Sequence, residues 1–393
     1  MPAEATEEEA GTREQDDRTA TRRPQLLVFP RWSDNPYLSM LYLAAEADGW
    51  RIRGTTKLQG FEQWAADRLK PGDVAHVHWT NPVLAGCESE EEARVHLERF
   101  RTALRTLRER GAHLLWTVHN ELAHDARFPD IERELAQALA EHASAIIQLH
   151  ERTAEAVAGS YELPADKLVT VAHSSYSGIY PDPWSRERAR QDLGVPQDAF
   201  TVGFIGRIRP YKGVDVLCAA VERAAERIPG ITLLLAGYAS PADQAAVEEV
   251  LPKSARVVKR LSFVPDEELG LWLRASDIMA LPYQRILNSG SAMLACSFDT
   301  PVIIPGPSTL ADVYAGEDWV RTYGATGDQA ANLADALVAA HSGLDGAARS
   351  ATRYARTHTP WTMSRDFLAV LERLGRRVPA TTAAAAARTE ELQ

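Results

Sequence analysis

The chain has 393 residues, of which 45% are hydrophobic and 25% charged, with a formal net charge of -11. This composition is typical of a soluble globular protein, and the length predicts two or three domains rather than a single core. The acidic balance argues against a nucleic-acid partner, because proteins that bind nucleic acids normally present a basic face.

The cysteines and the N-terminal residues bear on the compartment. Cys87, Cys218 and Cys296 are odd in number and widely separated, so neither a disulfide framework nor a zinc site is predicted, and a reducing cytoplasm fits best. Residues 1–23 are acidic, lack the apolar core of a signal peptide and are expected to be disordered. No apolar run approaches the roughly 20 residues that span a bilayer, although peripheral membrane contact stays open.

Residues 24–180 alternate between short apolar runs and helical patterns. The predicted strands are 25–29, 51–55, 74–78, 114–119, 145–149 and 168–172, and the predicted helices are 37–47, 61–69, 91–110, 131–142 and 154–159. This alternation predicts a doubly wound, Rossmann-like parallel sheet, in which ligands bind beyond the carboxyl ends of the strands.

Unusual polar and aromatic residues follow those strand ends. They are Trp32, Asp34, Asn35 and Tyr37 after the first strand, His78 after the third, His119 and Asn120 after the fourth, and His173 after the sixth. A single histidine at a strand end is more often a hydrogen-bonded structural residue than a catalyst. Their convergence on one edge of the sheet nevertheless predicts a functional site there.

Residues 181–198 carry prolines and many charges and are predicted to link two domains. The alternation restarts in residues 199–359, which predicts a second Rossmann-like domain. Its predicted strands are 200–205, 232–236, 257–263, 278–281 and 302–304, and its predicted helices lie near 214–227, 241–251, 266–275, 292–297 and 330–341.

The first strand of this second domain leads into a basic loop. The strand breaks at Gly206, and Arg207, Arg209 and Lys212 precede the next helix. Helix amides, the helix dipole and these cations together favour an anion. An ordinary solvated loop is the alternative.

A second loop in this domain precedes another helix. It contains Asn288, Ser289, Gly290 and Ser291, small residues that expose helix amides and allow a ligand close to the backbone. A plain helix cap is the alternative. With Arg207 and Lys212 on an earlier strand of the same sheet, this loop predicts a site for two linked phosphates.

The last part of the chain is an amphipathic helix followed by a polar tail. Residues 360–375 form this predicted helix, and residues 376–393, rich in alanine, threonine and charge, are predicted to be disordered or loosely helical.

These motifs resemble GT-B glycosyltransferases, particularly the nucleotide-sugar-dependent family 4. The segment GRIRPYKG carries most of the resemblance, and DVAHVHW, WTVHN, VAHSSY, FVPDEELGLWLRASDIMALPY and DTPVIIP occur in the expected order. The resemblance implies a GT-B fold of two facing Rossmann-like domains, with residues 360–375 crossing back onto the first. It also implies a nucleotide-sugar donor, a hydroxyl acceptor and no further cofactor or metal.

The resemblance also assigns roles to residues. Gly206, Arg207 and Lys212 would bind the donor diphosphate, and Phe263 and Val264 lie in the loop that would hold the base. His119 would face the donor sugar near the reacting centre. The acceptor would contact Trp32, Asp34, Asn35, Tyr37, His78, Asn120 and His173.

One departure from the family pattern concerns the donor site. Family 4 members usually carry two glutamates eight positions apart, where this chain has Ile286 and Leu294, and a glycine where it has Asp299. Donor binding would then rely on hydroxyls and helix amides, which leaves the base, the sugar and the stereochemical outcome open.

The predicted reaction is transfer of a glycosyl unit to a hydroxyl group, with Arg207 and Lys212 stabilising the leaving diphosphate. Retention is favoured, with the departing phosphate as the proton acceptor; inversion would need a base, for which Asp34, Glu121 and His124 are candidates. A sugar-nucleotide epimerase and a binding protein with degenerate catalysis are the alternatives. The oligomeric state is not predicted.

Overall fold

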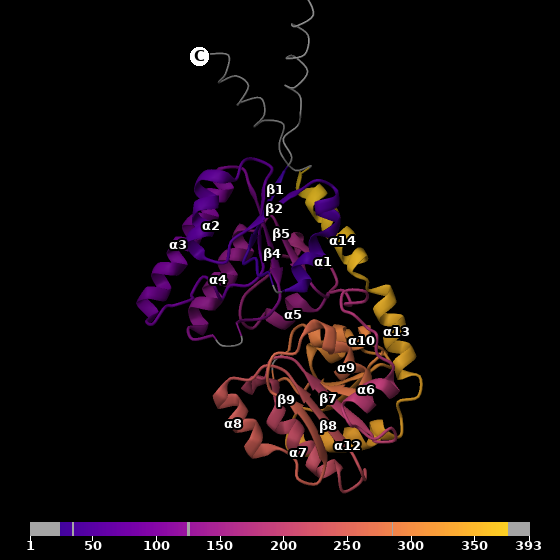
Figure 1. Cartoon of the computed structure of the whole chain (residues 1–393). Coiled ribbons are helices and arrows are strands. Elements are labelled where there is room, and N and C mark those ends of the chain that lie inside the picture. The colour runs from indigo at the N-terminus through magenta and orange to yellow at the C-terminus, as the bar shows by residue number, and fades with distance from the viewer. Residues whose placement is uncertain (1–23, 34, 124–125, 285, 376–393) are drawn as a thin grey trace, which may run out of the picture.

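The computed structural model describes residues 24–375 except Asp34, His124, Asp125 and Arg285. The two predicted disordered segments, 1–23 and 376–393, therefore lie outside the described residues. The described chain forms two α/β domains, one above the other in Figure 1, each built on a six-stranded parallel sheet. Among the described residues, no helix combines the length and apolar character needed to cross a bilayer.

The N-terminal sheet has the strand order β2-β1-β3-β4-β5-β6. Its strands are β1 (Gln25–Phe29), β2 (Arg51–Gly54), β3 (Val74–Val77), β4 (His113–Val118), β5 (Ala145–Gln148) and β6 (Leu168–Thr170). The helices are α1 (Pro36–Ala47), α2 (Leu58–Gln63) with a π-helical extension (Trp64–Arg68), α3 (Glu90–Glu109), α4 (Pro129–His142) and α5 (Thr153–Val157). Helices α2, α3 and α4 pack on one face of the sheet, and α1 packs on the other.

The C-terminal sheet has the order β12-β11-β10-β7-β8-β9. Its strands are β7 (Thr201–Ile205), β8 (Thr232–Ala236), β9 (Arg256–Arg260), β10 (Ile278–Ala280), β11 (Val302–Gly306) and β12 (Val320–Gly324). The helices are α6 (Arg186–Asp192), α7 (Val214–Ala224), α8 (Pro241–Val250), α9 (Leu269–Ala275), α10 (Gly290–Ser297), α11 (Thr309–Val313), α12 (Gln329–His341) and α13 (Ala347–Thr357). The predicted fold class is confirmed.

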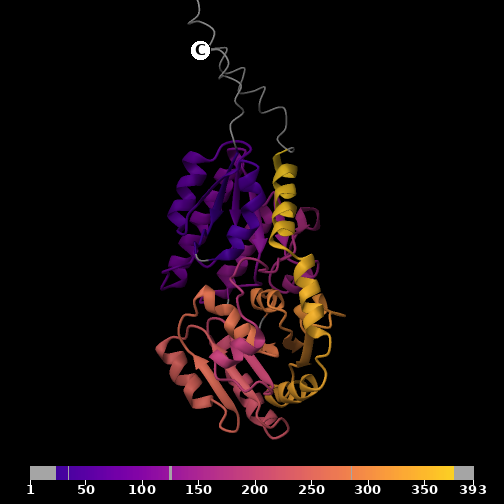
Figure 2. The same cartoon turned by 45° about the vertical axis from the view of Figure 1, so that its right-hand side comes forward.

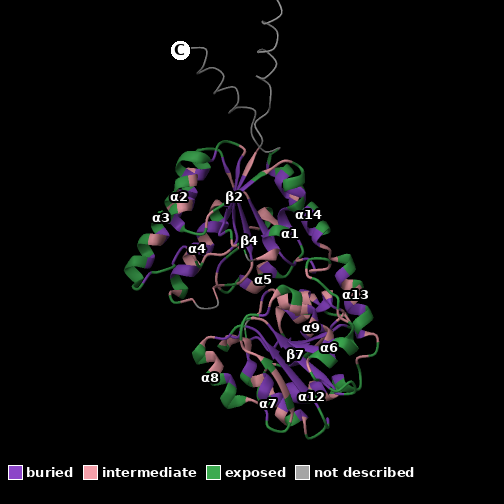
Figure 3. Cartoon of the chain, in the orientation of Figure 1, coloured by how far each residue is buried: buried purple, intermediate pink, exposed green. Residues whose placement is uncertain are grey.

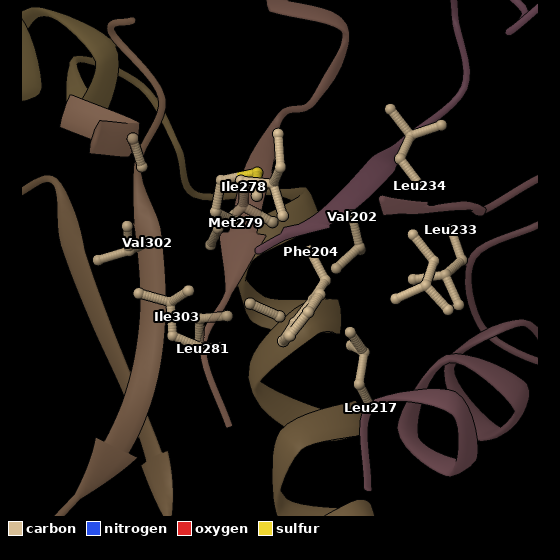
Figure 4. Packing of buried hydrophobic residues seen from close by; sticks show 14 of the residues in the cluster. Val202, Phe204, Leu217, Leu233, Leu234, Ile278, Met279, Leu281, Val302 and Ile303 are labelled. Carbon is tan, nitrogen blue, oxygen red and sulfur yellow. The ribbon is translucent and has the colours of Figure 1, made fainter. Parts of the chain in front are cut away.

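Each sheet is buried because helices cover both of its faces (Figure 3). In the C-terminal domain Val202, Phe204, Leu233 and Ile303 belong, with Leu217 of α7, to one continuous core (Figure 4). Strands buried on two faces read as unbroken apolar runs, which is why the sequence located most of them.

The end of the chain returns to the first domain. Helix α13 lies against α10 of the C-terminal domain, and α14 (Pro360–Gly375) then packs along α1, as Figure 2 shows in yellow. Ser364 accepts a hydrogen bond of 2.6 Å from the amide of Ala44, and Phe367 is fully buried among the α1 side chains. The apolar face of α14 thus completes the N-terminal domain.

The structure contains elements that sequence patterns did not indicate. Strand β12 and helices α6, α11 and α13 are short or largely polar, so their periodicity is weak. Helix α6 lies inside the predicted linker 181–198, where Arg190 is fully buried and donates to the carbonyls of Gln197, Ala199 and Ala275. These bonds attach the segment to the C-terminal domain.

Candidate active site

The basic loop after β7 depends on close backbone contacts. Gly206 (φ 133°) and Gly237 (φ 145°) end neighbouring strands, and a Cβ added to Gly237 would lie 1.8 Å from the Gly206 carbonyl oxygen. Gly213 (φ 66°) begins α7 beside the loop that follows β10, where a Cβ would meet the Pro282 carbonyl at 2.3 Å. The positive φ angle favours glycine at all three positions, and at Gly237 and Gly213 a Cβ would also clash with a backbone carbonyl. The loops after β7, β8 and β10 therefore meet at one edge of the sheet.

Three cations lie in this loop without a carboxylate partner among the described residues. The guanidinium of Arg207 lies 5.4 Å from the Tyr238 ring centroid, and the Lys212 ammonium lies 5.3 Å from that of Tyr283. Burial lowers the pKa of Lys212, with Arg207 and Arg209 also contributing to the decrease. Repelling, partly desolvated cations are stabilised by an anion, so the geometry suits a phosphate ligand.

The predicted second loop lies beside these cations. Tyr283, which packs against Lys212, donates a hydrogen bond of 3.0 Å to the hydroxyl of Ser291 in the first turn of α10. Ser289 caps α10 by accepting from the Ala292 amide at 3.1 Å, as the helix-cap alternative predicted. Asn288 instead crosses to the other domain, where its side-chain amide donates to the His119 carbonyl at 2.8 Å. The two predicted loops are therefore adjacent, and the second loop also joins the two domains.

A cavity of about 500 Å³ lies between the two domains. Arg207, Arg209 and Tyr211 line it from the C-terminal domain, and His119 lines it from the end of β4. The N-terminal side also contributes aromatic and polar side chains, namely Trp32, Trp79, Asn81, Trp116, Asn120, Glu121, Phe128 and Glu132. The cavity thus has a cationic wall facing an aromatic and acidic wall.

His119 is held firmly in that cavity. Its ring stacks on Trp79 with centroids 4.3 Å apart, and Tyr37 meets its edge at 5.1 Å. Its Nε2 lies 3.0 Å from Nδ1 of His78, and burial lowers the pKa of His119 well below the ordinary value. The ring is therefore neutral at physiological pH.

Of the remaining residues predicted to contact the acceptor, some line the cavity and others do not. Trp32 and Asn120 line the cavity, whereas Asn35 caps α1 by accepting from the Tyr37 amide at 3.0 Å. Tyr37 is buried behind the cavity wall, and His173 lies farther along the domain boundary, near Gly290. Asp34 lies outside the described residues.

His78 borders the cavity, yet both of its ring nitrogens already have protein partners. Its Nε2 lies 2.6 Å from the Tyr42 hydroxyl, and its Nδ1 faces His119. An acceptor hydroxyl could bond to these nitrogens only by displacing Tyr42 or His119.

The residues predicted to bind the nucleotide base differ in exposure, and of the carboxylate and histidine candidates for a general base only some are described. Phe263 is 68% exposed and Val264 is buried. Glu121 lines the cavity and accepts a hydrogen bond of 2.5 Å from Ser160, while His124 lies outside the described residues.

Sequence reasoning missed several residues of the site. Glu132 lines the cavity from α4, accepts from the Ala123 amide at 3.0 Å, and has its pKa raised by burial. No local pattern marks it, because only the packing of α4 brings it to the cavity. Tyr42, His76 and Thr117 lie directly behind His119. Alternation in the strands would have placed His76 and Thr117 on the face that carries His78 and His119.

Two facing Rossmann-like domains with a cavity between them define a GT-B fold, and comparison with known proteins agrees. Residues 199–342, most of the C-terminal domain, match the family model described as Glycosyl transferases group 1. The Anabaena protein HepE, solved in complex with UDP-glucose, superposes with a TM-score of 0.65 at 15% identity, covering 89% of this chain and 99% of that one.

Curated relatives point to the same class. The chain is 33% identical over 203 residues to a D-inositol 3-phosphate glycosyltransferase of Corynebacterium efficiens, covering 49% of this chain and 48% of the relative. It is 26% identical over 317 residues to a GDP-mannose:glycolipid 4-beta-D-mannosyltransferase of Xanthomonas campestris pv. campestris, covering 77% and 81%. The chain thus spans about half the length of the first relative and four fifths of the second.

Proposed function

We propose that this protein transfers a glycosyl unit from a nucleoside diphosphate sugar to a hydroxyl group of an acceptor. The observation that carries the proposal is the set of three cations, Arg207, Arg209 and Lys212, which have no carboxylate partner among the described residues. Arg207 and Arg209 line the interdomain cavity opposite His119, and Lys212 lies in the same loop against Tyr283. The group 1 domain and the two named transferases support the same reaction.

The C-terminal domain holds the donor in this proposal. Arg207 and Lys212 bind the diphosphate and stabilise the charge that develops on it as the glycosidic bond to phosphate breaks. The first-turn amides of α10, beside Ser291, supply further donors. These cations provide the charge stabilisation for which other transferases use a metal ion, and we propose no cofactor apart from the donor substrate.

The N-terminal domain receives the acceptor. Trp32, Trp79 and Trp116 offer flat apolar surfaces, and Glu121 and Glu132 offer carboxylates, a combination that suits a carbohydrate ring and its hydroxyls. Glycans, lipid-linked sugars and hydroxylated natural products share this chemistry. The glycolipid acceptor named for the Xanthomonas relative falls within this class.

We propose retention of configuration, with the departing phosphate accepting the proton of the acceptor hydroxyl. The anomeric configuration of the product, read by proton NMR, tests this step. An inverted product would instead require a protein base, and Glu121 and Glu132 are the described carboxylates that line the cavity.

The substitution Lys212→Ala tests the donor site. Loss of one preorganised charge should lower kcat by about 100-fold or more, measured as transfer from a nucleotide sugar. Lys253→Ala is the matched control, because Lys253 is an exposed lysine of the same domain away from the cavity. Unchanged turnover in Lys212→Ala would remove this site from the mechanism.

A thermal-shift series with UDP, GDP, dTDP and ADP identifies the base, because a ligand of the native state raises the melting temperature with concentration. The shift should be lost in Lys212→Ala.

Incubation with the donor alone distinguishes the transferase from an epimerase: an epimerase converts the sugar, whereas a transferase gives at most slow hydrolysis. Tight nucleotide binding without turnover on a broad acceptor panel would indicate a binding protein.

A further inference from the structure

Two neighbouring strands present a row of polar side chains to a buried face. In the register of the sheet His76 of β3 pairs with Leu115 of β4, so His76, His78, Thr117 and His119 alternate onto one face. This is the apolar face covered by α1 and α14. His76 and Thr117 are fully buried and His78 is 2% exposed. Buried polar groups require hydrogen-bond partners, so the partners of these side chains indicate where their hydrogens lie.

These side chains form one continuous hydrogen-bonded chain through Tyr42 of α1. The Tyr42 hydroxyl lies 2.9 Å from Nδ1 of His76 and 2.6 Å from Nε2 of His78. The inner end is Thr117, whose hydroxyl lies 2.8 Å from Nε2 of His76. The outer end is His119, whose Nε2 lies 3.0 Å from Nδ1 of His78. We call Thr117, His76, Tyr42 and His78 the buried relay.

The relay is closed to water from behind. Phe367 of α14 stacks on His76 with centroids 5.3 Å apart and meets the edge of Tyr42 at 5.2 Å. Tyr37 covers the edges of His78 and His119. Of the residues in this hydrogen-bonded chain, His78 and His119 at its outer end line the cavity, whereas Thr117, His76 and Tyr42 do not.

All members of the relay are neutral. Burial lowers the pKa of His76, His78 and His119 well below the ordinary value and raises that of Tyr42. A neutral imidazole carries one N–H and one lone pair, and each hydroxyl carries one hydrogen. Four contacts in series can then be satisfied with every hydrogen pointing toward the cavity or with every hydrogen pointing away from it. In a third arrangement both His76 and His78 donate to the Tyr42 oxygen, but this leaves the buried Tyr42 hydrogen without an acceptor and is therefore costly.

The inner end decides between these two directions. If the hydrogens point inward, His76 donates to Thr117, and the buried Thr117 hydroxyl needs a further acceptor; the described residues provide none. If they point outward, Thr117 donates to His76, His76 to Tyr42, Tyr42 to His78, and His78 to His119. Every hydrogen of the relay is then used, which avoids the cost of an unsatisfied buried donor.

The outward direction fixes the tautomer of His119. Its Nε2 accepts from His78, so its own hydrogen is on Nδ1, which has no hydrogen-bond partner among the described residues. We propose that the buried relay positions His119 and holds it as the Nδ1–H tautomer, so that the ring presents a neutral hydrogen-bond donor to an oxygen atom of the substrate in the cavity. His119 then serves as a hydrogen-bond donor and not as a general base. This catalytic role of His119 rests on the proposed transferase function.

The substitution Tyr42→Phe removes the centre of the relay. His78 then lacks its donor at Nε2 and can take its proton there, which leaves Nδ1 as a lone pair and allows His119 to move its hydrogen to Nε2. Long-range proton–nitrogen correlation spectra of histidine-labelled protein report this directly, with the His119 signals assigned by comparison with His119→Asn. The wild type should show a protonated Nδ1 and an unprotonated Nε2 in His119, and Tyr42→Phe should show the Nε2–H form.

Transfer kinetics give a second readout. Loss of one neutral hydrogen bond to the transition state should lower kcat of Tyr42→Phe by about tenfold while KM for the donor changes little. Tyr323→Phe is the matched control, because the Tyr323 hydroxyl on β12 is buried without a partner among the described residues. Its spectrum and kcat should match the wild type. Thr117→Val, nearly isosteric, removes the inner donor and should also release the tautomer, which provides a second test if Tyr42→Phe does not fold.

A wild-type His119 protonated on Nε2 would overturn the proposal, as would an unchanged tautomer in both Tyr42→Phe and Thr117→Val. The spectra need no substrate, so they stand apart from the proposed activity. A protein with the expected tautomers but no transfer from any nucleotide sugar would count against the transferase function and leave the relay in place.

Discussion

Asp299 illustrates how a single residue departs from a family pattern and is accommodated. It stands where the resembling family usually has glycine, and its φ of 58° is a left-handed value that side chains rarely adopt. Its carboxylate accepts hydrogen bonds from Arg274 at 2.6 Å and from Thr352 at 2.5 Å. Arg274 also pairs with Asp182, so these bonds join four segments of the chain, around residues 182, 274, 299 and 352. The carboxylate contacts offset the backbone cost.

Substitutions of Asp299 separate the stabilisation by its carboxylate contacts from the cost of its left-handed backbone angle. Asp299→Ala loses the carboxylate contacts and keeps the unfavourable φ, so it should lower the free energy of unfolding by about 2 kcal/mol. Asp299→Gly loses the same contacts but relieves the backbone, and should cost about 1 kcal/mol less than the alanine variant. Urea unfolding of both variants measures the difference. Equal stabilities would show that the backbone angle costs nothing here.

At the scale of elements, the loop between β10 and α10 joins the two domains. Leu287 belongs to this loop but is buried among the side chains of the N-terminal core. Its carbonyl lies 3.0 Å from Nε2 of His150, and the neighbouring Asn288 bonds to the carbonyl of His119. The same loop packs Tyr283 against Lys212. One segment therefore links the basic loop after β7 to His119 across the cavity.

The substitution Leu287→Ala should weaken this link. It removes buried methyl groups and should destabilise the docked arrangement by about 2–3 kcal/mol. Hydrogen exchange measured by mass spectrometry should rise both in residues 282–289 and in residues 113–120 of the other domain. Leu294→Ala is the control, since Leu294 is a partly buried leucine of α10 that packs against the C-terminal core. Exchange that rises in residues 282–289 alone would contradict a coupling between the domains.

At the scale of the whole molecule, the N-terminal domain buries several histidines that burial keeps neutral. Burial lowers the pKa values of His76, His78 and His119 well below 6.5, and it also lowers that of His173. Since the folded pKa lies below the unfolded one, the unfolded chain binds more protons once the pH falls below about 6.5. The stability contributed by these neutral rings is therefore fully present above that pH and is lost as the pH falls toward their folded pKa values.

Unfolding free energies measured in urea at several pH values test this pH dependence of stability. His76, His78 and His119, whose pKa values fall furthest, give a slope of about 4 kcal/mol per pH unit just below pH 6, and His173 adds to it. Glu132, whose pKa burial raises, opposes this trend at lower pH. Between pH 7.5 and 8.5 these histidines should contribute no slope. A slope below pH 6 corresponding to less than one proton would mean that these rings are charged in the folded protein.

Patterns of neighbouring residues were sufficient to predict the architecture and the basic loop that follows Gly206. Buried parallel strands such as Thr201–Ile205 are apolar on both faces, and the cations after Gly206 follow within a few residues, so local order specifies both. The tertiary structure alone decided which distant side chains meet. Tyr42, Glu132 and Leu287 reach the site through the packing of α1, α4 and the β10–α10 loop. Such contacts depend on how whole elements pack, and no pattern of neighbouring residues encodes that packing.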